Sequence, residues 1–228
     1  AVFNLNESEN GMWFEDLKNF SHLRSLHVQV PTSDLLFLKK FNQLEELYIY
    51  ESQNKNWSFV PSLTSLRHLS IYKSNFTHLN LIRELHLKQE EWNQVWNNKN
   101  PINLFYHKQL TNLSLIDCGI TSIAPLRECK YISELDLSQN NINDIRPIKC
   151  MKNIYYLTMR SNQIRDISPL KDLKGIYYLN VRHNQIEDIS VLASLRGGNI
   201  GHLYLGGNEI KDYSPIKNLQ LVSHDIES

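Results

Sequence analysis

The sequence is poor in several features that define other classes of protein. It has three cysteines in 228 residues, which are too few for a disulfide scaffold. Its longest apolar runs, such as residues 35–38, fall far short of the roughly 18 residues that cross a bilayer, so no membrane insertion is expected. Lys and Arg number 24, as do Asp and Glu, and the formal net charge is zero. Without a basic excess, we expect no general binding to nucleic acid.

Sequence signals of secretion, metal binding and catalysis are missing as well. Residues 1–9 lack a cationic start followed by an apolar stretch, so no signal peptide is visible. Nine histidines are scattered without a His-Glu-x-x-His or Cys-x-x-Cys motif, and the glycine-rich segment 197–201 lacks the full phosphate-binding pattern. Cys129 and Cys150 are predicted to be buried thiols. No metal, no cofactor and no enzymatic activity are therefore predicted.

What the sequence does have is a hydrophobic repeat of about 22 residues. Each copy carries an apolar residue, a Leu three positions later and another apolar residue two positions after that, as in Ile154-x-x-Leu157-x-Met159. Such alternation is typical of a short strand that buries every second side chain. The eight explicit copies begin at Leu23, Leu44, Leu66, Leu110, Ile132, Ile154, Ile176 and Ile200.

A second set of positions repeats behind each strand. Four copies have an Asn after the strand, with Ile two positions later and Asp four positions later: Asn140, Asn162, Asn184 and Asn208. An Asn side chain can satisfy backbone groups that a sharp turn leaves unpaired, so we predict a hydrogen-bonded column, the asparagine ladder. Cys118, Ser74 and Ser52 occupy the same column in other copies. In Ser168-Pro169 and Ser214-Pro215, a capping hydroxyl before a proline predicts a short helical turn.

One copy of the repeat is irregular. Leu66 and Leu110 lie 44 residues apart, which is two periods, so a unit around 82–109 is expected between them. The segment 82–87 fits a strand that comes early, with a short helix at 90–96 behind it. Alternatively, this segment belongs to the outer side of the preceding copy. The early strand is the favoured alternative, because the alternation of leucines continues there.

The clearest copies resemble leucine-rich repeats, in particular those of the bacterial internalin class and its Sds22-like relatives, in the phrases NQIRDISPLKDL, NQIEDISVLASL and NEIKDYSPIKNL. The resemblance implies an α/β repeat fold, a right-handed solenoid with a concave parallel β-sheet and short helical turns on the convex side. It also implies that partners bind the concave side and that the repeat performs no chemistry. We expect an N-terminal cap at 1–22, the repeat domain at 23–222 and a tail or truncated repeat at 223–228.

Strand alternation also predicts which side chains point outward from the sheet, where stacked copies place them in columns. One candidate partner-binding patch comprises Tyr156, Tyr178, Arg160, Arg182, His183, His202 and Tyr204, with Asp136 beside it. A second patch comprises Tyr48, Tyr50, Tyr72 and His68. Tyr and Arg are frequent binding anchors, and the two arginines would suit an acidic partner surface. The alternative is that the arginines extend into water and the tyrosines are simply good strand formers.

Together these features predict a noncatalytic module that recognises a protein partner on its concave face. The internalin resemblance favours a role in bacterial interaction with another cell, with a secreted or surface location. The alternative is an intracellular regulatory scaffold of the Sds22-like kind, located in the cytoplasm. The sequence predicts neither the identity of the partner nor the oligomeric state.

Overall fold

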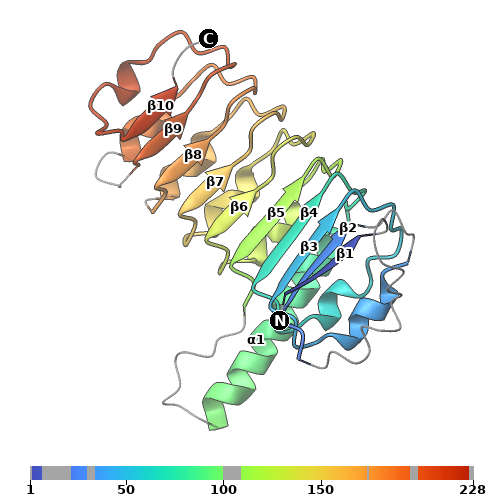
Figure 1. Cartoon of the computed structure of the whole chain (residues 1–228). Helices are drawn as coiled ribbons and strands as arrows, with labels where there is room; N and C mark the ends of the chain where they lie inside the picture. The colour runs from blue at the N-terminus through green and yellow to red at the C-terminus, as the bar shows by residue number, and fades with distance from the viewer. Residues whose placement is uncertain are drawn as a thin grey trace. The chain divides into compact units, whose positions relative to one another are not determined.

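The computed structural model describes residues 2–6, 22–29, 34–99, 109–173, 175–195 and 200–225. They fall into two compact units, an N-terminal unit that ends at Leu113 and a C-terminal unit that begins at Ser114. Within each unit, short parallel strands lie side by side in chain order, with short 3-10 helices between them in the chain (Figure 1). The predicted coil of strand, turn and short helical turn is therefore confirmed.

In the N-terminal unit the strands are β1 (Val2–Asn6), β2 (Ser25–Gln29), β3 (Glu46–Tyr50) and β4 (His68–Tyr72). Its helices are the 3-10 helices η2 (Leu36–Lys40) and η3 (Val60–Ser62) and the α-helix α1 (Leu79–Lys99). A further strand, β5 (Asn112–Ile116), begins in this unit. The register places Leu26, Leu47 and Leu69 in one row, and all three are fully buried.

In the C-terminal unit the strands are β6 (Glu134–Asp136), β7 (Tyr156–Thr158), β8 (Tyr178–Asn180), β9 (His202–Tyr204) and β10 (Ser223–Asp225). The 3-10 helices are η4 (Ala124–Glu128), η5 (Arg146–Cys150), η6 (Ser168–Asp172), η7 (Ser190–Leu195) and η8 (Ser214–Ile216). Leu135, Leu157, Leu179 and Leu203 pair in register, each with no exposed surface. The predicted inward column of leucines is confirmed.

The asparagine ladder forms as predicted. Asn162 Nδ2 donates to the carbonyl oxygens of Leu137, 2.9 Å away, and Met159, 3.1 Å away. Its Oδ1 accepts the Ile142 N–H at 3.0 Å. Equivalent bonds surround the other members of the ladder, Asn140, Asn184 and Asn208. Each amide therefore satisfies backbone groups of two successive coils that the turn leaves unpaired.

The turns into the 3-10 helices use a different side chain from the one expected. Asp166 Oδ1 accepts the Ser168 N–H at 2.8 Å, and Asp212 Oδ1 accepts the Ser214 N–H at 2.8 Å. The Ser214 hydroxyl donates to Asp212 instead of capping the helix. The prediction of a capping hydroxyl is wrong, because a carboxylate is the stronger acceptor and lies two residues earlier. The prolines do occupy the first turn.

The irregular copy contains a helix where an early strand was favoured, so that prediction is wrong. Ile82 and Leu85 lie in α1 and are fully buried. A spacing of three residues places side chains on one face of a helix as readily as it fits the repeat motif. The Thr111 N–H bonds to the Arg67 carbonyl at 3.0 Å, so β5 follows β4 directly.

Gln89, at the middle of α1, bonds to the backbone around this insertion. The side chain has no exposed surface. Its Nε2 donates to the Leu66 carbonyl at 2.7 Å, and its Oε1 accepts the Leu110 N–H at 2.9 Å. Leu66 and Leu110 are the first residues of the repeat copies before and after α1. Gln89 therefore bonds to the backbone of both copies.

Three smaller expectations concern the chain ends and the cysteines. In the segment predicted as a cap, residues 2–6 form β1 and pair with β2, while 7–21 lie outside the described residues. In the segment 223–228, only β10 is described. Cys129 is buried as predicted, but Cys150 is exposed. The prediction for Cys150 is wrong because Met151, the next residue, takes the core position.

Candidate partner-binding surface

The sheet face of the C-terminal unit carries a continuous set of aromatic rings. The register aligns Tyr156 of β7 with Tyr178 of β8 and His202 of β9. The rings of Tyr156 and Tyr178 stack with their centroids 4.1 Å apart and their planes 13° apart. Tyr178 also lies 5.3 Å from Tyr204 and 5.8 Å from His202. The structure therefore brings four of the predicted residues, from three strands, into ring contact.

Two further tyrosines, which the sequence reasoning missed, extend this set to the edge where the strands begin. Tyr155 and Tyr177 stack at 5.1 Å, and Tyr155 is 51% exposed. Tyr177 meets His202 edge-on at 5.1 Å. The signal was the Tyr-Tyr pair that recurs one period apart in Ile-Tyr-Tyr-Leu. We define the C-terminal aromatic surface as Tyr155, Tyr156, Tyr177, Tyr178, His202 and Tyr204.

The two arginines of the predicted patch have different surroundings. Arg160, two residues after β7, is exposed. Arg182, two residues after β8, forms an ion pair with Asp225 of β10. The guanidinium carbon of Arg182 lies 4.7 Å from the ring centroid of Tyr204, a cation–π contact. The Arg182 guanidinium is thus paired within the protein, whereas Arg160 is exposed to solvent.

Acidic and phenolic groups beside these rings have shifted pKa values. Asp136 accepts the Ser138 N–H at 2.9 Å. Burial raises the pKa of Asp136, and it outweighs the opposing effects of the Ser138 hydrogen bonds and the Arg160 charge. Burial, followed by the hydrogen bond with Tyr178, raises the pKa of Tyr156. The Tyr156 phenol is therefore neutral at physiological pH and offers a hydroxyl rather than a charge.

Strand alternation also turns Thr158 and Asn180, which pair in register, toward the sheet face. They are only 5% and 9% exposed and offer little surface to a partner. His183 is exposed in the left-handed turn after β8, with φ of 52°. A Cβ at Gly207 would lie 2.4 Å from His183 Nδ1, so the imidazole ring rests on the Gly207 backbone. His183 therefore lies at the edge where the strands end, opposite the edge that carries Tyr155.

The N-terminal unit carries a second set of rings on its sheet. Tyr48 lies between two imidazoles: its ring stacks 4.1 Å from His27 and lies 4.8 Å from His68. Tyr50 and Tyr72 pair in register beside them. Burial, followed by the charge of Glu46, raises the pKa of Tyr48. The sequence reasoning missed His27, which occupies the Tyr48 position one copy earlier. We define the N-terminal aromatic surface as His27, Tyr48, Tyr50, His68 and Tyr72.

Other kinds of site have less support in the described ranges. Among those residues, His, Cys, Asp and Glu do not gather in groups of three or more that could hold a metal ion. The two aromatic surfaces are the functional candidates that the repeat itself assembles. In the same part of the chain, none of the helices combines the length and the apolar character needed to span a membrane.

Stacked coils with a Leu and Ile core, an asparagine ladder and short 3-10 helices define a leucine-rich-repeat solenoid. The family model "Leucine Rich repeats (2 copies)" matches residues 132–172 and 152–194. Residues 132–194 therefore match leucine-rich repeats, which the repeat phrases predicted.

Among solved structures, the chain resembles two internalins from Listeria monocytogenes. Internalin C2 is 26% identical with a TM-score of 0.73, and the match covers 94% of this chain and 83% of that chain. The internalin inlF is 25% identical with a TM-score of 0.78, covering 99% of this chain and 61% of that chain. The predicted resemblance to internalins is confirmed. A comparison with curated proteins found no match.

The same fold occurs in a plant receptor. The leucine-rich-repeat ectodomain of the Arabidopsis thaliana receptor kinase GASSHO1/SCHENGEN3 was solved in complex with CASPARIAN STRIP INTEGRITY FACTOR 2. It is 18% identical with a TM-score of 0.58, covering 84% of this chain and 22% of that chain. This likeness shows a shared fold, and in that ectodomain the fold holds a binding partner.

Proposed function

We propose that this chain is a noncatalytic recognition module that binds a protein partner through the C-terminal aromatic surface. The observation that carries the proposal is the contact of six aromatic side chains from three successive coils, with Tyr155 half exposed. Rings that stack on one another lose little conformational freedom when a partner covers them, and each buries a large area. Such a set is suited to anchoring a protein surface.

Charge beside the rings defines the kind of partner. Arg160 is exposed and places a positive charge just after β7, beside the rings of the surface. An acidic partner surface suits this arrangement. The similarity to two Listeria internalins supports a role in bacterial interaction with another cell. An intracellular regulatory scaffold of the Sds22-like kind is the second candidate context, and it would use the same surface.

The test requires a partner recovered by affinity capture and then identified. Surface plasmon resonance compares its binding to the wild type and to single variants. Tyr156→Ala and Tyr178→Ala should weaken binding by about tenfold or more, because central aromatic anchors dominate interfaces. Arg160→Ala should weaken binding by about threefold to tenfold and reduce its salt dependence, since an acidic partner is attracted to this charge.

The matched control is Lys171→Glu, an exposed residue on η6, outside the sheet. This variant should bind like the wild type. If Lys171→Glu abolishes binding while both tyrosine variants retain it, the interface lies on the helical side of the coils and the proposal is wrong.

A further inference from the structure

The strand β10 is held differently from the other strands of the C-terminal unit. The middle residues of β7, β8 and β9 are Leu157, Leu179 and Leu203, which have no exposed surface. The corresponding residue of β10 is His224, which pairs in register with Leu203 but is exposed. Val222, just before the strand, is 73% exposed. The strand β10 therefore contributes little of the apolar burial that stabilises its neighbours.

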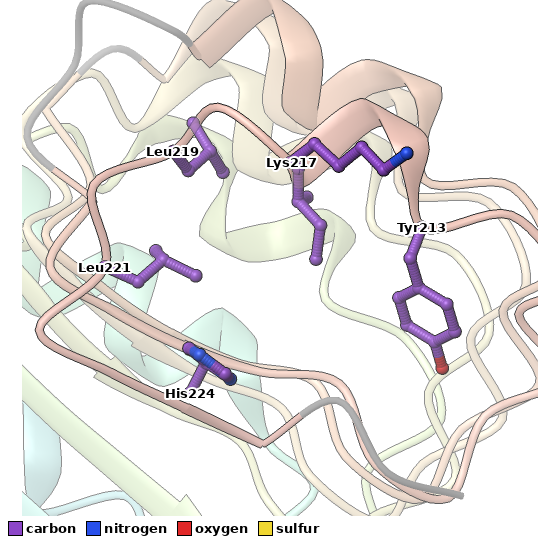
Figure 2. Close-up of a pocket in the computed structure, with 6 residues that line it drawn as sticks. Tyr213, Lys217, Leu219, Leu221 and His224 are labelled. Atoms are coloured by element: carbon purple, nitrogen blue, oxygen red, sulfur yellow. The ribbon is translucent and has the colours of Figure 1, made fainter.

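A hollow that opens to solvent lies beside β10 in this last coil. Its volume is about 260 Å³. It is lined by Tyr213, Ile216, Lys217, Leu219, Leu221 and His224. Figure 2 shows Tyr213 and Lys217 across an open space from Leu221 and His224. Because this open space separates His224 and Leu221 from Tyr213 and Lys217, side-chain packing contributes little to anchoring β10.

Polar contacts hold β10 instead, and they converge on the C-terminal aromatic surface. The Ser223 hydroxyl lies 2.6 Å from His202 Nδ1 and 2.7 Å from the Tyr204 hydroxyl. Asp225 Oδ1 accepts the Gly206 N–H at 2.9 Å, and Asp225 Oδ2 forms the ion pair with Arg182. Both carboxylate oxygens of Asp225 are therefore bound.

The groups around Asp225 form a built carboxylate site. A backbone N–H and a guanidinium bind the two oxygens, and Tyr204 supports the guanidinium from its ring face. Arg182 Nε is buried without a hydrogen-bond partner in this arrangement. An unpaired buried donor is unfavourable. Arg182 therefore does not make all of its possible hydrogen bonds while Asp225 is its partner.

We infer that Arg182, Tyr204 and the Gly206 amide form a binding site for a carboxylate, and that Asp225 occupies it until an extended acidic segment of the protein partner displaces β10. The inference rests on the proposed function in that the partner binds the sheet of the C-terminal unit. It adds that β10 competes with the partner, because its carboxylate is already tethered next to the site.

The probe for this site is a fluorescent synthetic peptide with the sequence of residues 219–228, LQLVSHDIES. Fluorescence anisotropy measures its binding to the full chain. Asp225→Asn removes the charge of the internal competitor and keeps an oxygen for the Gly206 N–H. This variant should bind the peptide at least tenfold more tightly than the wild type. A peptide with Asn in place of the Asp should bind both chains weakly.

Two controls make the peptide result specific. Glu209→Gln changes an exposed charge by the same amount elsewhere in the C-terminal unit and should bind the peptide like the wild type. Arg182→Lys, added to Asp225→Asn, should lose the gain, because an ammonium cannot reproduce the guanidinium geometry. Equal affinity of the wild type and Asp225→Asn for the acidic peptide overturns the inference. So does undiminished binding by the Arg182→Lys double variant.

A second measurement needs no variant and guards against misfolding. The Leu205 and Gly206 amides donate to Asp225, whereas the Tyr178 amide bonds to Tyr155. Hydrogen exchange in the wild type should be at least tenfold faster at the first two amides, because β10 opens more readily than β8. Equal exchange rates at the Leu205, Gly206 and Tyr178 amides would overturn the inference that β10 is displaced. Neither measurement uses the recovered partner, so failure here leaves the Tyr156 and Arg160 test of the proposed function unaffected.

Discussion

The two units satisfy the backbone after each strand with different side chains. In the C-terminal unit, Asn140 accepts the Cys118 N–H at 3.1 Å and donates to the Leu115 carbonyl at 2.7 Å, among other bonds. In the N-terminal unit, the hydroxyl of Ser74 stands in this column and accepts the Ser52 N–H at 3.0 Å. An amide has two donor hydrogens and an acceptor, whereas a hydroxyl has one donor hydrogen. The asparagine ladder can therefore pair more backbone groups per coil.

The N-terminal unit has larger buried side chains in place of a regular ladder. Trp57 and Phe76 pack edge to face with centroids 4.9 Å apart, and both are fully buried or nearly so. Gln89 pairs the backbone beside the α1 insertion. The comparison teaches that a repeat solenoid can keep one register with two different means of support. One is the periodic hydrogen bonding of the asparagine ladder. The other is a few buried residues, such as Trp57, Phe76 and Gln89, whose contacts do not recur from coil to coil.

Removing one member of the asparagine ladder should have the largest effect. Asn162→Ala should lower the free energy of unfolding of the C-terminal unit by about 3 kcal/mol, since several buried backbone groups lose their partner. Urea denaturation followed by circular dichroism measures the loss. All four tryptophans lie before residue 114, so tryptophan fluorescence follows the N-terminal unit and should change less.

The control for that substitution is the neighbouring exposed residue, Gln163→Ala, which should leave the urea midpoint nearly unchanged. An Asn162→Ala protein with the midpoint and slope of the wild type would show that the ladder does not support this unit.

The corresponding test in the N-terminal unit is Gln89→Ala. We expect a loss of about 2 kcal/mol, because the Leu66 carbonyl and the Leu110 N–H would be left buried without this partner. Tryptophan fluorescence during urea denaturation is the measurement. Glu84→Ala, an exposed position on α1, is the matched control. A loss no larger than that of the control contradicts the role assigned to Gln89.

Ser74→Asn tests whether the ladder can be extended into the N-terminal unit. By the spacing seen at Asn162, the new amide would reach the Ile49 and Ile71 carbonyls. We expect a gain of about 1 kcal/mol in the free energy of unfolding, the usual value of one net hydrogen bond. A raised urea midpoint in the fluorescence curve would confirm it. A lowered midpoint would mean that the N-terminal coils have no room for the amide.

The smallest expected effect concerns pH and belongs to the C-terminal unit. Because burial raises the pKa of Asp136 in the folded state, its contribution to stability is fully present below the unfolded pKa of about 3.9 and is lost as pH rises through the folded pKa. Asp136→Asn should remove this dependence of the unfolding free energy on pH. Urea midpoints by circular dichroism between pH 3.5 and about 7 measure it. An unchanged slope in the variant would assign the pH response to other groups.

The periodic part of the molecule could be predicted from the sequence. Leu157 and Asn162 recur every 22 residues or so, and a fixed period determines both the face and the column of every member. The aromatic residues Tyr156 and Tyr178 were predicted for the same reason. Tyr155 shares that period, but it precedes the strand. Strand alternation therefore does not predict whether its side chain points into the core or into solvent.

The aperiodic contacts could not be predicted in this way. Ile82 and Leu85 have a spacing that fits either a helix or the repeat motif, so periodicity alone does not distinguish the two. The ion pair of Arg182 connects it with β10, two strands further along the sheet. Only the register of β9 and β10 places Asp225 within reach. The different surroundings of Arg160 and Arg182 therefore required the structure.

The asparagine ladder also determines how heat should disassemble the C-terminal unit. Each Asn bonds to the coil before it as well as to its own, so these bonds strengthen the coupling between neighbouring coils rather than any one coil alone. Linear arrays with strong nearest-neighbour coupling melt cooperatively. The last Asn of the ladder in the described chain is Asn208, and the coil that carries β10 lies beyond it. Fraying should begin at that coil, and β6 to β9 should then melt in a single step.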